Sequence, residues 1–234
     1  MNFVEPIRDR KKIAQIKNLL RGQQRFRDLL LFTVGINTAL RISDVLQLRI
    51  GQFVDEQGGV HSRFEVREIK TGKRHDVTVN DSIREAIKEY LAAYPDMTSN
   101  PDNFIFFNSE YNRYSASLKR GRVWEFISTI CKEVGLQGNY GTHSLRKTWG
   151  YQARMQGVDL ALIMYKLNHV SLADTKRYIG ITNDEVEEVV RKLNLWLRVY
   201  MGISTTAVPN TPIESILYAI HFQVRHIIIN EIGV

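Results

Sequence analysis

The chain has 234 residues, of which 44% are hydrophobic and 24% charged, the balance of a globular protein with room for one good core. Its formal net charge of +7 favours an anionic partner, and its single cysteine, Cys131, excludes an intrachain disulfide and a multi-cysteine zinc site. We find no signal peptide and no run of about 18 apolar residues, so we expect a cytoplasmic protein without a membrane span.

The first part of the chain is predicted to be helical and then to form a hairpin. Apolar residues recur at helical spacing over residues 8–20 and 26–39, and Ser43 is placed to cap a short helix that runs to Leu48. Partial alternation over residues 61–69 and 74–80 then predicts two strands. The basic turn Lys70-Thr-Gly-Lys73 joins them.

The rest of the chain returns to helical patterns. Ser82 and Glu85 form a capping box for a helix that Pro95 stops, and a short strand is expected at residues 104–107. A basic helix over residues 117–134 ends at Gly135. Four more helices are expected at residues 142–156, 159–167, 171–179 and 184–200. These elements predict a mainly α-helical α+β domain over residues 1–202, with a small antiparallel β-sheet.

The end of the chain has a different character. Residues 204–212 contain two prolines and are typical of a linker, and apolar residues recur at helical spacing from Ile213 onward. We therefore expect residues 203–234 to form a linker and a C-terminal segment. That segment docks on a neighbouring subunit, packs on its own domain, or adds a strand to the small sheet.

Five polar residues lie in short sequence words whose residue types suit metal-free attack on a phosphodiester: Arg41, His143, Arg146, His169 and Tyr178. Such a reaction needs a nucleophile, cations that stabilise the phosphorane, and an acid for the leaving oxygen. An arginine fork donates two hydrogen bonds to phosphate oxygens, and a tyrosine can form a covalent phosphotyrosine. His143 and Arg146 share one face at the start of a predicted helix, where Thr142 is placed as the cap and the amide end favours a phosphate.

The order and wording of these segments resemble the catalytic domain of the tyrosine recombinase (phage integrase) family over roughly residues 8 to 200. The resemblance implies that Arg41 and Arg146 bind the scissile phosphate and that His143 transfers a proton and contacts the phosphate. It also implies that His169 donates a hydrogen bond to the phosphate and that Tyr178 is the nucleophile. No metal or nucleotide cofactor is implied.

The family also uses a hairpin lysine as the acid for the leaving 5′ oxygen. Lys70 resembles it most, and Lys73 is the alternative. The sequence departs from the family pattern at Ala39 and Asn168, where glycine is usual. No N-terminal DNA-clamping domain precedes Arg8, so we expect either a short stand-alone member or an excised catalytic domain.

Other residues are candidates for supporting roles. Asp44 either contacts Arg41 from one helical turn away or has a simple capping or surface role. Backbone contacts to DNA are expected from the basic residues near the start of the predicted helix over residues 117–134, namely Lys119, Arg120 and Arg122, and from Lys73.

The predicted function is therefore that of a site-specific DNA recombinase or integrase that acts through a covalent 3′-phosphotyrosine. The expected partners are double-stranded DNA, further copies of the chain as a tetramer on paired sites, and accessory proteins. The expected location is the nucleoid of a prokaryote, or the DNA of a virus or mobile element. Two alternatives stay open: a type IB topoisomerase, and a DNA-binding regulator that has kept the fold and lost cleavage.

Overall fold

The computed structural model describes residues 4–111, 114–181, 187 and 190–192. The chain divides into two compact units, Met1–Ile181 and Thr182–Val234. The predicted boundary at residue 202, the linker and the C-terminal segment lie outside the described residues, as does most of the helix predicted at 184–200. Their organisation stays a prediction.

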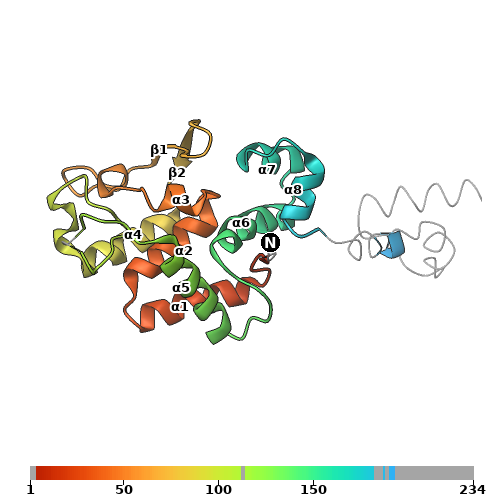
Figure 1. Ribbon diagram of the computed structural model, residues 1–234, viewed down its shortest axis with the longest axis horizontal. Coiled ribbons are helices and arrows are strands. Elements are labelled where there is room, and N and C mark those ends of the chain that lie inside the picture. The colour runs from red at the N-terminus through yellow and green to blue at the C-terminus, as the bar shows by residue number, and fades with distance from the viewer. Residues whose placement is uncertain (1–3, 112–113, 182–186, 188–189, 193–234) are drawn as a thin grey trace, which may run out of the picture. The chain divides into compact units, whose positions relative to one another are not determined.

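The described part of the first unit is mainly helical, as predicted (Figure 1). In chain order its helices are α1 (Arg10–Gly22), α2 (Phe26–Thr38), α3 (Ile42–Val45), α4 (Asp81–Ala93), α5 (Arg120–Glu133), α6 (Thr142–Met155), α7 (Leu160–Lys166) and α8 (Leu172–Tyr178), with the short 3-10 helices η1 (Ile50–Gln52) and η2 (Pro95–Ser99). None of the helices in the described residues combines the length and the apolar character that a membrane span needs.

The predicted hairpin is confirmed, with shorter strands. Strand β1 (Arg63–Arg67) pairs antiparallel with β2 (Arg74–Thr78) as a two-stranded sheet. Residues 104–107 were predicted as a strand, and that prediction is wrong: Phe104 and Phe107 each make only a single bridge, to Arg49 and Ser117. The two bridging partners come from different segments, so no continuous ladder forms.

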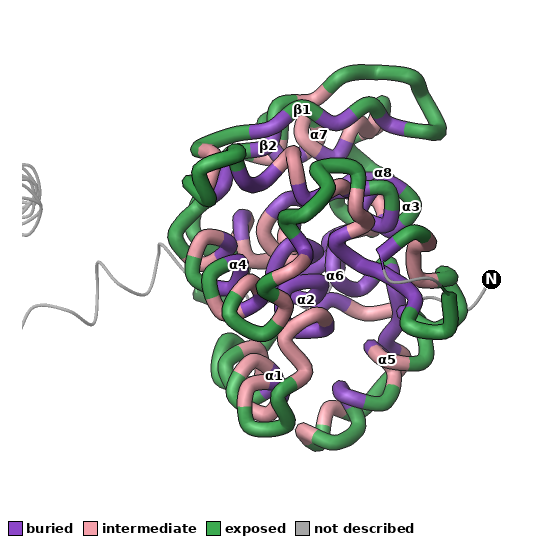
Figure 2. The backbone as a smooth tube through the Cα atoms, turned by 90° about the vertical axis from the view of Figure 1, so that its left-hand side faces the viewer, coloured by how far each residue is buried: buried purple, intermediate pink, exposed green. Residues whose placement is uncertain are grey.

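Helix α2 lies at the centre of the fold because nearly all of its faces are apolar. Its residues Leu29, Leu30, Leu31 and Phe32 have no exposed surface. Figure 2 shows α2 and α6 in the buried interior. In both views the hairpin, α7 and α8 lie at one end of the unit, and α1 and α5 lie at the other. The turn of the hairpin and the helix that carries Tyr178 are thus brought to the same end.

The capping box predicted for α4 is wrong. Asn80 is the cap, and its side chain accepts a hydrogen bond from the Ile83 amide at 3.0 Å. Ser82 lies inside the helix. Glu85 instead forms an ion pair with Arg21 of α1. The asparagine takes the cap because its backbone is extended at the point where the helix begins.

Two other predicted caps are also wrong. Arg41 precedes α3 with extended backbone, so Ser43 falls inside that helix, which ends at Val45. Gly141 precedes α6, so Thr142 is the first helical residue rather than the cap. Two predicted helix ends are confirmed. Helix α5 ends before Gly135, whose φ is +75°, and helix α4 ends before Pro95.

Helices α6, α7 and α8 enclose a small apolar cluster apart from the main core. Its buried members are Ala39, Ala153, Ile163, Leu167 and Ile179, and the ring of Tyr178 packs against them. Gly150 of α6 shows how closely these segments pack, since a Cβ at this position would lie 2.6 Å from Ile179. This cluster fixes where Tyr178 lies relative to α6.

Candidate active site

One concave cavity of about 430 Å³ is lined by all six residues predicted to act in catalysis. They come from five separate segments of the chain, which the fold brings to one end. The cavity is lined by Arg41, Lys70, His143, Arg146, Asn168, His169, Val170, Asp174, Arg177 and Tyr178. Sequence reasoning did not name Val170, Asp174 or Arg177.

Arg146 holds two loops together beneath the cavity. Its side chain is buried, and it donates hydrogen bonds to the carbonyl of Ala39 at 2.7 Å and to the carbonyl of Leu167. Ala39 and Asn168 have φ values of +60° and +50°. Glycine is the residue best suited to this left-handed region, which accounts for its usual presence at both positions in the family that the sequence resembles. The two departures therefore keep the loop geometry that the arginine requires.

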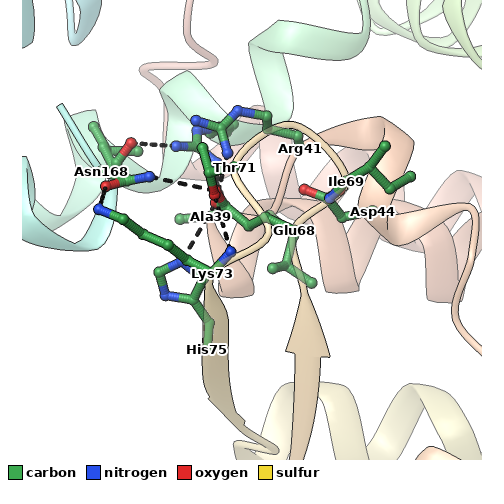
Figure 3. A network of polar contacts seen from close by, with 12 residues as sticks. Ala39, Arg41, Asp44, Glu68, Ile69, Thr71, Lys73, His75 and Asn168 are labelled. Carbon is green, nitrogen blue, oxygen red and sulfur yellow. Dashed lines mark hydrogen bonds and ion pairs between the residues drawn. The ribbon is translucent and has the colours of Figure 1, made fainter.

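Arg41 is paired with a carboxylate that the sequence-based prediction missed. Glu68 follows β1 and is 3% exposed, and its Oε1 lies 2.5 Å from Nη1 of Arg41 (Figure 3). Its Oε2 accepts a hydrogen bond from the Thr71 hydroxyl at 2.6 Å, and Nε2 of His75 lies 3.5 Å from Oε1. One carboxylate thus connects the cavity arginine to the hairpin turn.

Glu68 stays negatively charged despite its burial. Burial alone would raise the pKa of Glu68, but the hydrogen bond from Thr71 and the pairing with Arg41 lower it to about 2. The strand alternation carried a signal for this residue. Glu68 follows Phe64 and Val66 at every second position, so it belongs to the buried face of the hairpin.

Asp44 contacts the hairpin, which neither of its two expected roles included. Its carboxylate is 1% exposed, and it accepts a hydrogen bond from the Ile69 amide at 3.0 Å. This contact joins α3 to the hairpin next to Lys70. The ion pair with Arg41, for which Asp44 was a candidate, is made by Glu68.

The two candidate hairpin lysines lie in different environments. Lys70 lines the cavity, whereas Nζ of Lys73 donates a hydrogen bond to Oδ1 of Asn168 at 3.0 Å. Both side chains are exposed. The geometry favours Lys70 over Lys73 as the acid, because only Lys70 lines the cavity that holds Tyr178.

Hydrogen bonds orient the second histidine. The Thr175 hydroxyl donates to the Ser171 carbonyl at 2.9 Å, so its oxygen accepts from Nδ1 of His169, 3.1 Å away. With its proton on Nδ1, the neutral imidazole has an unprotonated Nε2 that is free of the Thr175 contact. Desolvation and the charges of Arg146 and Arg41 lower the pKa of His169.

Tyr178 ends α8 among aromatic and cationic groups. Its ring meets the His169 ring edge-on, with centroids 4.9 Å apart, and the ammonium of Lys147 lies 5.1 Å from its centroid. Burial raises the pKa of the Tyr178 phenol, while the charges of Arg146 and Arg41 act to lower it. Burial also lowers the pKa of Lys147 to about 8. Sequence reasoning missed this lysine, which no periodic pattern distinguishes from a solvated one.

His143 lies in the first turn of α6, at the cavity wall. Desolvation lowers its pKa, and the charges of Arg120 and Arg146 lower it further. A neutral imidazole in this position can accept a proton. Lys119 and Arg122 are exposed near the start of α5, beside Arg120, and their predicted contact with DNA stays a prediction.

The cavity therefore combines a phenol with several cations at the N-terminal end of a helix. Such a site can bind a phosphate diester and stabilise the charge of a pentacovalent phosphorane next to an oxygen nucleophile.

Comparison with known proteins gives a consistent result. The sequence model of the Phage integrase family matches residues 9–185. The chain is 35% identical over 184 residues to "Probable integrase/recombinase YoeC" of Bacillus subtilis, which covers 79% of this chain and 93% of that protein. It is 26% identical over 181 residues to "Tyrosine recombinase XerA" of Pyrococcus horikoshii, covering 77% of this chain and 60% of that one.

A solved structure supports the predicted fold class. The XerH site-specific recombinase bound to its palindromic difH substrate, in a post-cleavage complex, aligns with a TM-score of 0.62. The alignment covers 80% of this chain and 51% of that chain at 21% identity, a likeness that concerns the fold alone. The fold of the described residues is thus that of a tyrosine recombinase catalytic domain, as predicted.

Proposed function

The chain belongs to the phage integrase family, and from its cavity we propose that it cleaves and rejoins DNA strands as a site-specific tyrosine recombinase. The observation that carries this proposal is the position of Tyr178 in one cavity with Arg41 and Arg146. The name of the YoeC protein, 93% of which aligns with this chain, supports the same activity. The chain aligns with only 60% of the length of XerA. Its activity as a complete recombinase is therefore proposed here.

The proposed reaction is a direct transfer of the phosphate to the tyrosine. The Tyr178 phenol attacks phosphorus and its proton passes to His143, while Arg41 and Arg146 stabilise the phosphorane. The bond between phosphorus and the 5′ oxygen then breaks, and Lys70 gives a proton to that oxygen. A 3′-phosphotyrosine remains. The reverse attack by a 5′ hydroxyl reseals a strand, and no nucleotide is consumed because the bond energy is retained.

We propose double-stranded DNA as the substrate and further copies of the chain as partners on paired sites. The net charge of +7 and the cationic cavity suit a polyanion, and XerH has been solved bound to its palindromic difH substrate. We place the activity at the nucleoid of a prokaryote or on the DNA of a virus or mobile element. A tetramer on two sites would provide one tyrosine for each of the four strands exchanged.

Covalent trapping tests the proposal. A nicked duplex that loses a short fragment after cleavage accumulates the adduct, and candidate sites come from selection of bound fragments out of random duplexes. Wild-type protein should form the adduct, and Tyr178→Phe should not. An adduct that survives the substitution would refute the assignment of the nucleophile.

Two further assays separate the alternatives. Recombination between two marked sites supports a recombinase, whereas relaxation of a single supercoiled plasmid without strand exchange would identify a topoisomerase. Specific binding with no adduct on any selected site would identify a non-cleaving regulator.

A further inference from the structure

We propose that Asn168 is a positioning residue that latches the hairpin turn of Lys70 across the cavity, through Lys73 and Glu68. The inference rests on the proposed function, since it assigns the latch to the acid of that reaction. Asn168 stands where the family usually has glycine, so the latch would distinguish this chain from members with that glycine.

The latch consists of two hydrogen bonds, one made by the oxygen and one by the nitrogen of the Asn168 side-chain amide. Oδ1 of Asn168 accepts from Nζ of Lys73 at 3.0 Å, and its Nδ2 donates to Oε2 of Glu68 at 3.4 Å (Figure 3). Lys73 and Glu68 close the turn from its two sides, because the Glu68 amide donates to the Lys73 carbonyl at 2.8 Å. Asn168 therefore holds both ends of the turn that contains Lys70.

The backbone at Asn168 suits this residue. With φ of +50° the position disfavours most side chains, but asparagine tolerates the left-handed region better than other non-glycine residues. A glycine would fit the backbone better but would make neither contact. The asparagine side chain thus adds an interaction without a change in the loop.

The turn is attached on its α3 side, where Arg41 pairs with Glu68 and Asp44 accepts from the Ile69 amide, and Asn168 adds an anchor from a second loop. The Ile69 amide donates to Asp44 before the turn, whereas Lys70 is exposed and Gly72 has φ of +69°. A lysine on a loosely held turn spends less time near the leaving oxygen, and proton transfer requires hydrogen-bond reach. Asn168 also neighbours His169, so the latch joins the acid to the loop of the second histidine.

The first test measures the latch in the free protein, without any reaction. Asn168→Gly should accelerate hydrogen–deuterium exchange in the segment of residues 69–73 while the unfolding temperature stays at or above the wild-type value. Gln24→Gly is the matched control, because Gln24 also has positive φ, is exposed and lies after α1, outside the cavity. It should leave exchange in the turn unchanged. Unchanged exchange in Asn168→Gly would overturn the latch, whether or not the protein cleaves DNA.

The second test asks whether the latch acts through the acid. Asn168→Gly and Lys73→Met should each slow cleavage of a nicked duplex about tenfold, the effect of one lost hydrogen bond, and the double variant should be no slower than either. Arg74→Met removes the neighbouring hairpin charge, and we expect it to cleave at close to the wild-type rate.

A bridging sulfur in place of the 5′ oxygen makes the result specific. Breaking the phosphorus–sulfur bond releases a thiolate, which leaves without a proton because thiols are far more acidic than alcohols. Asn168→Gly and Lys73→Met should therefore cleave the sulfur-containing substrate at the wild-type rate. Equal losses on both substrates would overturn the inference, because Asn168 would then act on the phosphate rather than through Lys70. If wild-type protein forms no adduct on either substrate, the proposed function fails and the exchange result decides the latch.

Discussion

The Glu68 carboxylate lies 2.5 Å from the Arg41 guanidinium, so a buried negative charge sits directly behind an arginine that lines the cavity. A buried ion pair is weak evidence for net stability, because desolvation offsets the attraction. The ion pair has a clearer effect on the orientation of Arg41 than on stability. A guanidinium has five N–H donors in a fixed plane, so a partner on one side determines which donors face the cavity.

Replacing this carboxylate should therefore weaken catalysis. Glu68→Gln keeps the size of the side chain and its ability to accept from Thr71, but it loses the charge that orients Arg41. We expect cleavage to fall about ten- to a hundredfold, the effect of losing roughly one to two charge-assisted hydrogen bonds. Single-turnover cleavage of a nicked duplex measures it, and a wild-type rate in Glu68→Gln would contradict the role of Glu68.

The same variant should change how stability depends on pH. The folded pKa of Glu68, about 2, lies below its ordinary value of 4.5. Its contribution to the free energy of unfolding is thus present above about pH 4.5 and lost as the pH falls toward 2. Between neutral pH and pH 2, the free energy of unfolding of wild-type protein should fall by about 3 kcal/mol relative to that of Glu68→Gln. Urea unfolding at several pH values checks this, and a pH-independent difference would contradict the assigned charge.

Thr175 should control the proton of His169. Its oxygen accepts from Nδ1, so a neutral His169 has no proton on Nε2, and only the protonated ring can donate to a phosphate from that side. The contribution of this donation to cleavage should therefore fall as the pH rises through the pKa of His169, which burial lowers. Thr175→Val should flatten that fall, because the neutral ring can then carry its proton on Nε2, and Thr175→Ser should keep it. Identical pH–rate profiles for the two variants would rule this out.

Gly150 should be necessary for the position of Tyr178. A Cβ at Gly150 would press on Ile179 at 2.6 Å, so Gly150→Ala should displace the end of α8 at a cost of about 1–3 kcal/mol. Gly22→Ala is the control, because Gly22 is exposed and no atom lies within 4 Å of its Cβ position. Thermal unfolding and adduct yield should both drop in Gly150→Ala alone. Equal behaviour of the two variants would show that the α6–α8 contact does not set the tyrosine.

The basic residues around the start of α5 should contact the DNA backbone. Alanine at Lys119, Arg120 or Arg122 should weaken DNA binding and lower the slope of log affinity against log salt by about 0.9 for each phosphate that the variant no longer neutralises. Lys132, at the other end of α5, is a control whose replacement should leave the slope as it is. Titrations at several salt concentrations provide the slopes. Unchanged slopes in all three variants would place the DNA elsewhere.

Much of the fold and the site could be predicted because the relevant signals are local. Periodic apolar residues revealed most of the helices and the hairpin, and short words carried Arg41, Arg146 and Tyr178. The helix caps at Ser43, Ser82 and Thr142 were wrong, because a residue just upstream took the extended backbone of the cap in each case.

The missing parts depend on contacts between distant segments. Neither the pairing of Glu68 with Arg41 nor the contact of Asn168 with Lys73 has a local pattern, since each joins parts of the chain that meet only in the fold. Alternation placed Glu68 on the buried face of its strand, but only the structure identifies its partner. The strand predicted at residues 104–107 failed for a related reason, because apolar residues there are buried by packing rather than by a ladder.

The chemical identity of the covalent adduct tests the central claim most directly. Wild-type protein trapped on a nicked duplex should be digested with protease and nuclease, and the modified peptide sequenced by mass spectrometry. The proposed mechanism predicts a single modified residue, Tyr178, joined through its phenolic oxygen to a 3′ phosphate. A nucleotide attached to any other residue, or a 5′ phosphate on the tyrosine, would contradict it.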